Sequence, residues 1–300
     1  MAGQARCLLC GREGLRAKLR TEKGLIAACP NCGLSQTVDG RSEADLAGLY
    51  DEGYALSQPA RPDGVQRERY QRLLRLALER RPPPARLLEV GVGQGWLLAQ
   101  AKEAGYEVLG ADLSAGGAEI AAQSSGVRVL AGRLDQLGLA DSSQEVILMR
   151  HVLEHLGNPL ENLEEVRRIL VPGGFLIGAV PNFNSLKRRL DGAEWFFLTL
   201  PHHRLHFTPR SLQSMLGRAG LKPARIRTAE HFPFHRAVFQ VGLNRFRRLA
   251  GRPEAPIDYD PARIEVNSLV TWLLAQEPRL HRFLARVGLG EEIVFVAVKR

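Results

Sequence analysis

The chain has 300 residues and a formal net charge of +9. Its 45% hydrophobic and 24% charged content excludes a disordered chain and predicts a globular protein with one full domain and a smaller unit. No signal-peptide pattern opens the chain and no apolar run reaches membrane-spanning length, so we expect a cytoplasmic location. The basic charge suits nucleic acid, a membrane surface or an anionic small molecule, and also a plain bias toward arginine.

All four cysteines form two Cys-x-x-Cys pairs near the N-terminus, at Cys7, Cys10, Cys29 and Cys32. Two such pairs bring four thiolates together around a tetrahedral Zn²⁺, with a short hairpin between them. Disulfides do not suit a reducing cytoplasm, and a redox pair would not explain two motifs. We predict a zinc ribbon over residues 1–40, separate from the rest of the fold, with a structural metal.

The segment that follows is expected to connect the ribbon to the main domain. Residues 41–64 form this linker, in which Tyr50 and Tyr54 either help to cover a bound ligand or simply pack. A helix is predicted over 65–80, and the prolines after Arg81 end it.

Residues 86–97 hold a strand, a glycine turn and the start of a helix, which together bring a ligand close to bare backbone. A dinucleotide fingerprint would place its third glycine at position 96, which is Trp96. Glu89 at the end of the strand would repel a pyrophosphate but accept a hydrogen bond from an amino group. Asp112 ends the next strand and is placed to accept both hydroxyls of a ribose. The implied ligand has a ribose, a cationic amino-acid end and no phosphate, and S-adenosylmethionine fits this description.

This pattern, Glu89-x-Gly-x-Gly-x-Gly95 followed by Asp112, resembles the class I S-adenosylmethionine-dependent methyltransferases. The resemblance continues through residues 145–149, 151–155, 170–174 and 181–182, and covers roughly residues 65–230. It implies an α/β fold: a Rossmann-like, mostly parallel seven-stranded sheet with helices on both faces and an antiparallel last strand over 292–298. The methyltransferase domain would then span residues 65–300, with a helical insert over 231–290.

The resemblance also assigns the cofactor site, to Glu89, Gly91, Gly93, Gly95, Asp112, Leu113, Leu134 and Met149. One position departs from the family. The residue after Gly132 is usually an acid that binds the adenine amino group, and here it is Arg133. The backbone amide of Leu134 could still reach the adenine, and Asp135 is the nearest carboxylate.

Residues 195–207 are rich in aromatic side chains and histidines. They resemble the segment that covers the active site in methyltransferases associated with bacterial surface sugars, so Trp195, Phe196 and Phe197 are expected to exclude water. Methyl transfer depends on positioning and on removal of a proton, so the candidate general bases are, in order, His203, His206 and His155. Ordinary packing of these histidines, a hydrophobic plug at the sheet edge and catalysis without a protein base all remain open.

The leading hypothesis for function is a methyltransferase that acts on a small molecule such as a sugar, nucleotide-sugar or lipid-linked saccharide. RNA or protein methylation through the ribbon and the basic surface is the first alternative, although the ribbon lacks stacking aromatics. A non-enzymatic binding protein is the second, supported only by Arg133. The arginine-rich stretch 236–249 predicts a helix for a membrane surface, for its own domain or for a dimer partner, packed against a helix over 266–287.

Overall fold

The computed structural model describes residues 5–39, 64–229 and 279–300. The predictions for the linker, including Tyr50 and Tyr54, and for the helix over 236–249 lie outside these residues. Of the helix expected over 266–287, the described part is helical from 279 to 286. No helix in the described ranges is long and apolar enough to span a bilayer.

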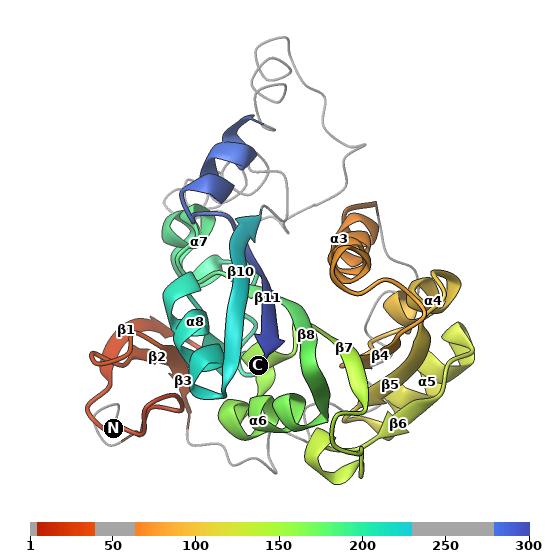
Figure 1. The fold of residues 1–300 in the computed structure, drawn as a ribbon. Coiled ribbons are helices and arrows are strands. Elements are labelled where there is room, and N and C mark those ends of the chain that lie inside the picture. The colour runs from red at the N-terminus through yellow and green to blue at the C-terminus, as the bar shows by residue number, and fades with distance from the viewer. Residues whose placement is uncertain (1–4, 40–63, 230–278) are drawn as a thin grey trace.

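A seven-stranded sheet forms the centre of the molecule (Figure 1). Five strands run parallel to their neighbours, and β11 runs antiparallel to β8 on one side and to β10 on the other. This arrangement confirms the predicted sheet with its antiparallel last strand. From one edge to the other the strands are β10 (Leu221–Ala229), β11 (Glu292–Lys299), β8 (Leu170–Pro181), β7 (Gln144–Arg150), β4 (Arg86–Val90), β5 (Glu107–Asp112) and β6 (Val129–Ala131).

Helices cover both faces of this sheet, because successive side chains of a buried strand point to opposite faces. Leu87 packs with α3 (Gly64–Arg80) and α4 (Trp96–Glu103). Leu88, on the other face of the sheet, packs with α6 (Pro159–Ile169) and α8 (Pro209–Arg218). The fifth of these helices, α5 (Ala115–Ser125), contacts α4 and β5.

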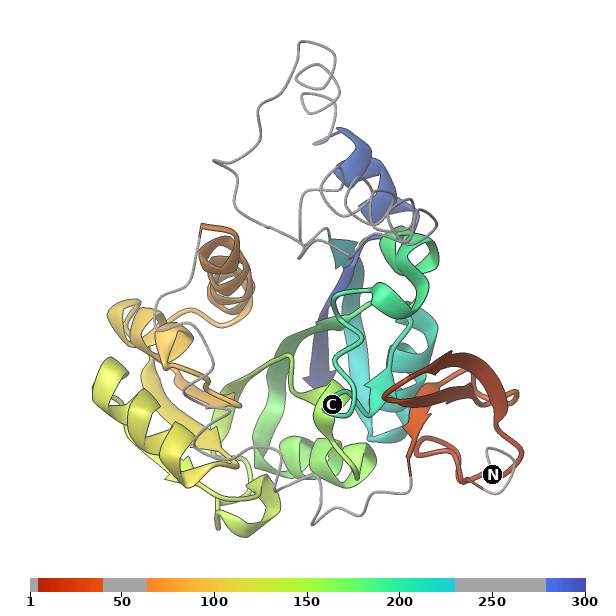
Figure 2. The same ribbon diagram turned by 180° about the vertical axis from the view of Figure 1, so that it is seen from behind.

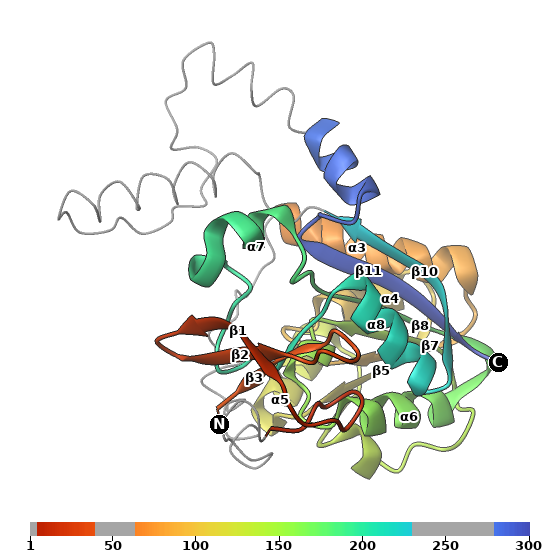
Figure 3. The same cartoon turned by 90° about the vertical axis from the view of Figure 1, so that its left-hand side faces the viewer.

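The N-terminal ribbon contains β1 (Arg16–Thr21), β2 (Gly24–Ala28) and β3 (Ser35–Val38). A fourth strand, β9 (Leu205–His206), comes from the histidine-rich segment and pairs with β3. The expectation of a separate ribbon is therefore wrong. The ribbon joins the main domain because its apolar side chains, such as Leu9 and Leu34, are buried in one core with Phe207 and α8. Figure 2 and Figure 3 show the backbone of the ribbon on the side of the molecule where α8 lies.

Short helices follow the carboxyl ends of several parallel strands. They are η2 (Leu134–Gln136) after β6, η3 (Leu153–His155) after β7, and α7 (Leu186–Asp191) with η4 (Gly192–Glu194) after β8. Open α/β sheets bind their ligands at this edge, so these loops define where a site should be sought.

Candidate active site

Two of the three glycines in the turn between β4 and α4 allow close packing with neighbouring residues, and the third borders open space. All three have positive φ, at 73°, 52° and 78°. A Cβ at Gly91 would lie 2.5 Å from Val152 Cγ2, and one at Gly95 would lie 2.7 Å from the Ala121 carbonyl oxygen. A Cβ at Gly93 would meet nothing within 4 Å. Gly93 is thus the point at which a ligand can approach the backbone at the N-terminus of α4.

Glu89 presents a buried carboxylate oxygen to the same edge. The residue is 2% exposed, and its Oε2 has no hydrogen-bond partner among the described residues. Burial raises the pKa of this carboxyl well above its usual range, although the charge of Arg150 works in the other direction. An unsatisfied buried oxygen is unfavourable unless a ligand donates to it. A cationic amino group would satisfy it.

Asp112 is held rigidly at the end of β5. Its Oδ2 accepts the amide of Val92 at 3.1 Å, and its Oδ1 accepts the amide of Ser114 at 3.0 Å. Burial raises the pKa of Asp112, and these amides oppose that rise. A carboxylate oxygen can accept more than one hydrogen bond, so Asp112 is a candidate acceptor for ribose hydroxyls. Beside it, Leu113 is 43% exposed and offers an apolar surface to a planar base.

The other predicted cofactor residues lie deeper. Leu134 and Met149 are 4% and 1% exposed and belong to the core, so a ligand would meet mainly their backbone. Arg133, which stands where the family has an acid, pairs its Nε with Asp135 Oδ1 at 3.2 Å. A carboxylate is therefore present at this loop, but it is already paired with a cation.

At the end of β7, His151 lies between two carboxylates. Its Nδ1 is 2.8 Å from Glu154 Oε1 and its Nε2 is 2.9 Å from Glu292 Oε1. Burial alone would lower the pKa of His151, but the two carboxylates raise it overall. Glu292 is also buried, and the hydrogen bond and charge of His151 outweigh that burial and lower its pKa to about 2. Both ring nitrogens of His151 therefore face a carboxylate oxygen.

Sequence reasoning missed two residues at this edge. Glu292 is 141 positions away from His151, and only the pairing of β11 with β8 brings them together. Tyr70 of α3 packs its ring 4.5 Å from the guanidinium carbon of Arg150 and accepts from its Nη1 at 3.3 Å. A tyrosine inside a helical pattern gives no local signal of such a role.

Residues 195–207, which we call the lid segment, lie over the ends of β7 and β8. The Phe197 ring stacks on His151 at 5.5 Å, and Trp195 Nε1 donates to Glu291 Oε1 at 3.4 Å. Trp195 and Phe197 are buried, in a cluster that includes Ile26 of the ribbon. Phe196 is 50% exposed, so the expectation that it excludes water is not met.

The three candidate bases are buried or partly buried imidazoles. His203 Nδ1 donates to the Phe197 carbonyl at 2.7 Å, and the ring meets that of His155 edge-on at 4.7 Å. His206 lies apart from this pair, with its Nε2 3.0 Å from the hydroxyl of Thr37 in the ribbon. Burial is the main cause that lowers the pKa of His155, lowers that of His203 well below its usual range, and lowers that of His206 to about 3. All three are neutral at physiological pH.

The four ribbon cysteines converge. Their sulfurs lie within 4.8 Å of one another, with Cys7 to Cys32 at 3.4 Å and Cys10 to Cys29 at 3.5 Å. A tetrahedral zinc with Zn–S bonds of about 2.3 Å places its sulfurs about 3.8 Å apart. Each pair turns through a glycine of positive φ, with Gly11 donating to the Cys7 carbonyl and Gly33 to that of Cys29. The donor set fits a structural zinc ion.

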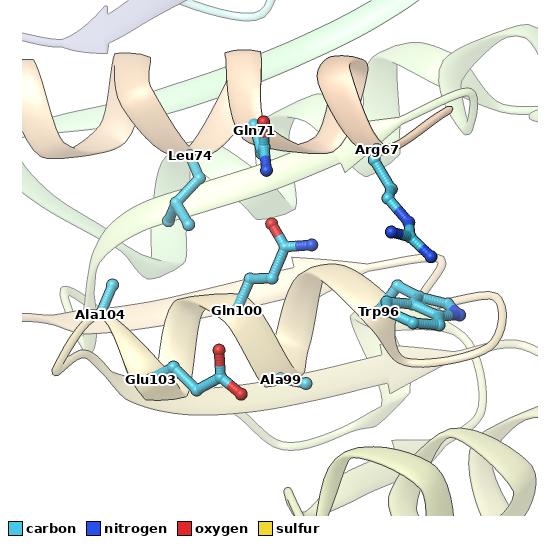
Figure 4. A pocket seen from close by; sticks show the side chains of 8 residues that line it. All are labelled: Arg67, Gln71, Leu74, Trp96, Ala99, Gln100, Glu103 and Ala104. Carbon is cyan, nitrogen blue, oxygen red and sulfur yellow. The ribbon is translucent and has the colours of Figure 1, made fainter. Parts of the chain in front are cut away.

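A cavity of about 690 Å³ lies elsewhere, between α3 and α4 (Figure 4). It is lined by Arg67, Gln71, Leu74, Trp96, Ala99, Gln100, Glu103 and Ala104. Since neither Glu89 nor Asp112 lines it, it is not the site described above.

Comparison with known proteins decides the family. Residues 64–225, more than half of the chain, match the model of a methyltransferase domain. The chain belongs to this family. Among curated proteins, it is 34% identical over 149 residues to a ubiquinone biosynthesis O-methyltransferase of Cereibacter sphaeroides, and 35% over 159 residues to one of Ruegeria pomeroyi. These matches cover 46% and 49% of the chain, and 60% and 64% of the relatives' lengths.

Solved structures agree with the methyltransferase fold. One is a chain from the complex between the Haloferax volcanii Trm112 methyltransferase activator and a methyltransferase, with a TM-score of 0.53 and 18% identity over 82% of this chain and 96% of that one. Another is an S-adenosylmethionine-dependent methyltransferase from Archaeoglobus fulgidus, with a TM-score of 0.53 and 18% identity, covering 78% and 94%. At such identities the likeness establishes the fold, which is the class I methyltransferase fold.

Proposed function

We propose that this chain transfers a methyl group from S-adenosylmethionine to a small-molecule acceptor. One observation carries the proposal: the partnerless Glu89 oxygen, the open space at Gly93 and the fixed carboxylate of Asp112 all lie at one edge of the sheet. Together they match an amino group, a backbone approach and a ribose. When bound, S-adenosylmethionine supplies a sulfonium methyl group that a nucleophile displaces in line.

The chain's own residues would divide this work. Glu89 accepts from the amino group, Asp112 accepts from the ribose hydroxyls, and Leu113 packs against the base. The lid segment closes the acceptor side, with Phe197 packed on His151. This arrangement orients the two reactants and excludes water, which is the larger part of catalysis for a simple displacement.

Removal of the acceptor's proton is a smaller contribution to catalysis in this proposal. A base with a strongly lowered pKa takes up a proton weakly, so positioning carries most of the rate. Among the histidines, His203 of the lid segment and His155 of η3 are favoured for this role, because their rings meet at 4.7 Å. His206 is the weakest of the three, since its pKa is about 3.

A small acceptor is favoured over RNA or protein. The curated relatives are named for ubiquinone biosynthesis, which is small-molecule chemistry. The ribbon also pairs with β9 and packs on α8, so part of its surface is built into the domain and unavailable to grip a macromolecule. A sugar, nucleotide-sugar or lipid-linked saccharide remains our proposal for the acceptor class.

Calorimetry with S-adenosylmethionine and S-adenosylhomocysteine tests the cofactor site. Asp112→Ala removes two charge-assisted contacts and should weaken binding by about 100-fold or more. Gly93→Val should abolish binding, since its side chain enters the ligand's space.

Gly173→Val is the matched control, because Gly173 has a φ of 75° and equally open surroundings but lies in β8 away from the site. It should keep native affinity. Absence of binding to the native chain, or unchanged affinity in both site variants, would remove the basis of the proposal.

A further inference from the structure

A second group of potential metal ligands lies outside the ribbon. One carboxylate oxygen of Glu154 and one ring nitrogen each of His155 and His203 lie within 4.8 Å of one another. Glu154 is fully buried and His203 is 6% exposed, while His155 is partly exposed. Two of these residues belong to η3 and the third to the lid segment.

The hydrogen bonds of Glu154 leave one of its two carboxylate oxygens for a metal. Glu154 Oε1 is bonded to His151, whereas its Oε2 is buried without a hydrogen-bond partner in the described part of the chain. A fully buried and unsatisfied carboxylate oxygen calls for a bound group. This observation is independent of the proximity of the two histidines.

Both imidazoles are held in the same tautomer. His155 Nδ1 is 3.2 Å from the His202 carbonyl, and His203 Nδ1 is 2.7 Å from the Phe197 carbonyl. A carbonyl only accepts, so each Nδ1 carries the proton and each Nε2 carries the lone pair. A ring N–H bonded to a backbone carbonyl is the usual arrangement of a metal-ligating histidine. The hydroxyl of Thr199, 3.2 Å from His203 Nε2, can rotate away.

We propose that Glu154 Oε2, His155 Nε2 and His203 Nε2 bind a divalent transition-metal ion. Two imidazoles and a carboxylate suit Zn²⁺, Fe²⁺ or Co²⁺, whereas Mg²⁺ and Ca²⁺ prefer an all-oxygen shell. A metal about 2.1 Å from each ligand requires the ligands to be within about 4.2 Å of one another, so the three side chains must move closer together when the ion binds. His151 Nδ1 is hydrogen-bonded to the other carboxylate oxygen, Glu154 Oε1, and so orients the carboxylate.

Such an ion would tie the lid segment to the end of β7, because His203 lies on the first and Glu154 and His155 follow the second. It would also engage the Nε2 atoms of His155 and His203, so neither could act as a general base. Metal binding here does not depend on the proposed methyl transfer. The two can fail separately, since one is measured with metal and the other with S-adenosylmethionine.

A titration of the metal-free full chain with Co²⁺ separates this site from the ribbon. Cobalt bound by four cysteines gives intense thiolate charge-transfer bands, whereas cobalt bound by two histidines and a carboxylate gives only weak d–d bands. The native chain should take up two equivalents, one with each signature. A single equivalent with thiolate character only would overturn the proposal.

His203→Gln should remove the second equivalent and keep the first. His206→Gln is the matched control, because His206 is an equally buried imidazole of the same segment whose Nε2 faces Thr37. It should keep both equivalents. A second equivalent that persists in His203→Gln would mark adventitious binding and sink the assignment.

The native chain provides a test that needs no variant. In ¹⁵N spectra of the imidazoles, the second equivalent of Zn²⁺ should shift the Nε2 resonances of two histidines and leave those of His206 in place. Unchanged Nε2 resonances would contradict the proposal even if the variants failed to fold.

Discussion

Replacement of Glu292 by Gln tests how much the buried charges around His151 stabilise the fold. Glu292 accepts from His151 at 2.9 Å and also faces Arg72 at 3.6 Å. Its pKa falls from 4.5 to about 2, which corresponds to about 3 kcal/mol in favour of the folded state. Because the side chain is buried, solvent screening does not reduce this figure much. Glu292→Gln should therefore lower the free energy of unfolding at pH 7 by about 3 kcal/mol.

The pH dependence follows with a definite sign. A lowered carboxyl pKa stabilises the fold above pH 4.5, and this contribution is lost as the pH falls toward 2. The raised pKa of His151 acts in the opposite sense: its contribution is full below its unfolded pKa of about 6.5 and is lost as the pH rises through its folded pKa. Replacing Glu292 should flatten the acid limb of the profile.

Urea denaturation between pH 3 and pH 8 measures both effects. Glu164→Gln is the control, since Glu164 is an exposed carboxylate on α6, and its change should stay within about 0.5 kcal/mol. A loss below about 1 kcal/mol for Glu292→Gln, or an acid limb as steep as that of the native chain, would refute the reasoning.

Two further predictions concern the join between ribbon and lid. Thr37→Val removes a buried hydroxyl that contacts the His203 carbonyl at 2.7 Å and His206 Nε2 at 3.0 Å, and should cost about 1–3 kcal/mol in urea denaturation. The partly exposed Thr21→Val should cost less, and equal losses would contradict the argument. Chelation of the ribbon metal should raise amide exchange at Leu205 and His206, because their partner strand is lost. Exchange confined to residues 5–39 would show that the ribbon melts alone.

The proposed cofactor site could be inferred from the sequence because its signals are local. Glu89, the three glycines and Asp112 lie within one strand–turn–helix–strand stretch, and the backbone of that stretch brings them to one edge of the sheet. The convergence of the four cysteines could be predicted for the same reason, since the spacing within each pair sets the turn. Short-range geometry needs no knowledge of the tertiary fold.

The acceptor side could not be predicted in this way. The contact between Glu292 and His151 spans 141 positions, and that between Thr37 and His206 spans 169. Both contacts depend on strand register. A two-residue strand such as β9 is too short to show a periodic pattern in the sequence. The histidines were singled out by type, but their partners, and hence their lowered pKa values, arise only from packing.

The ribbon is therefore better understood as part of the lid than as an appended domain. A unit of about 35 residues cannot bury enough apolar surface to be stable alone. It gains that burial by packing Ile26 against Trp195 and Phe197, and Leu9 and Leu34 against α8. The same contacts fix the lid segment above the ends of β7 and β8, where Arg204 also pairs with Asp39 of the ribbon. A metal that folds the ribbon would thus act on the acceptor side without touching the acceptor, because the surface it stabilises is the surface that holds the lid in place.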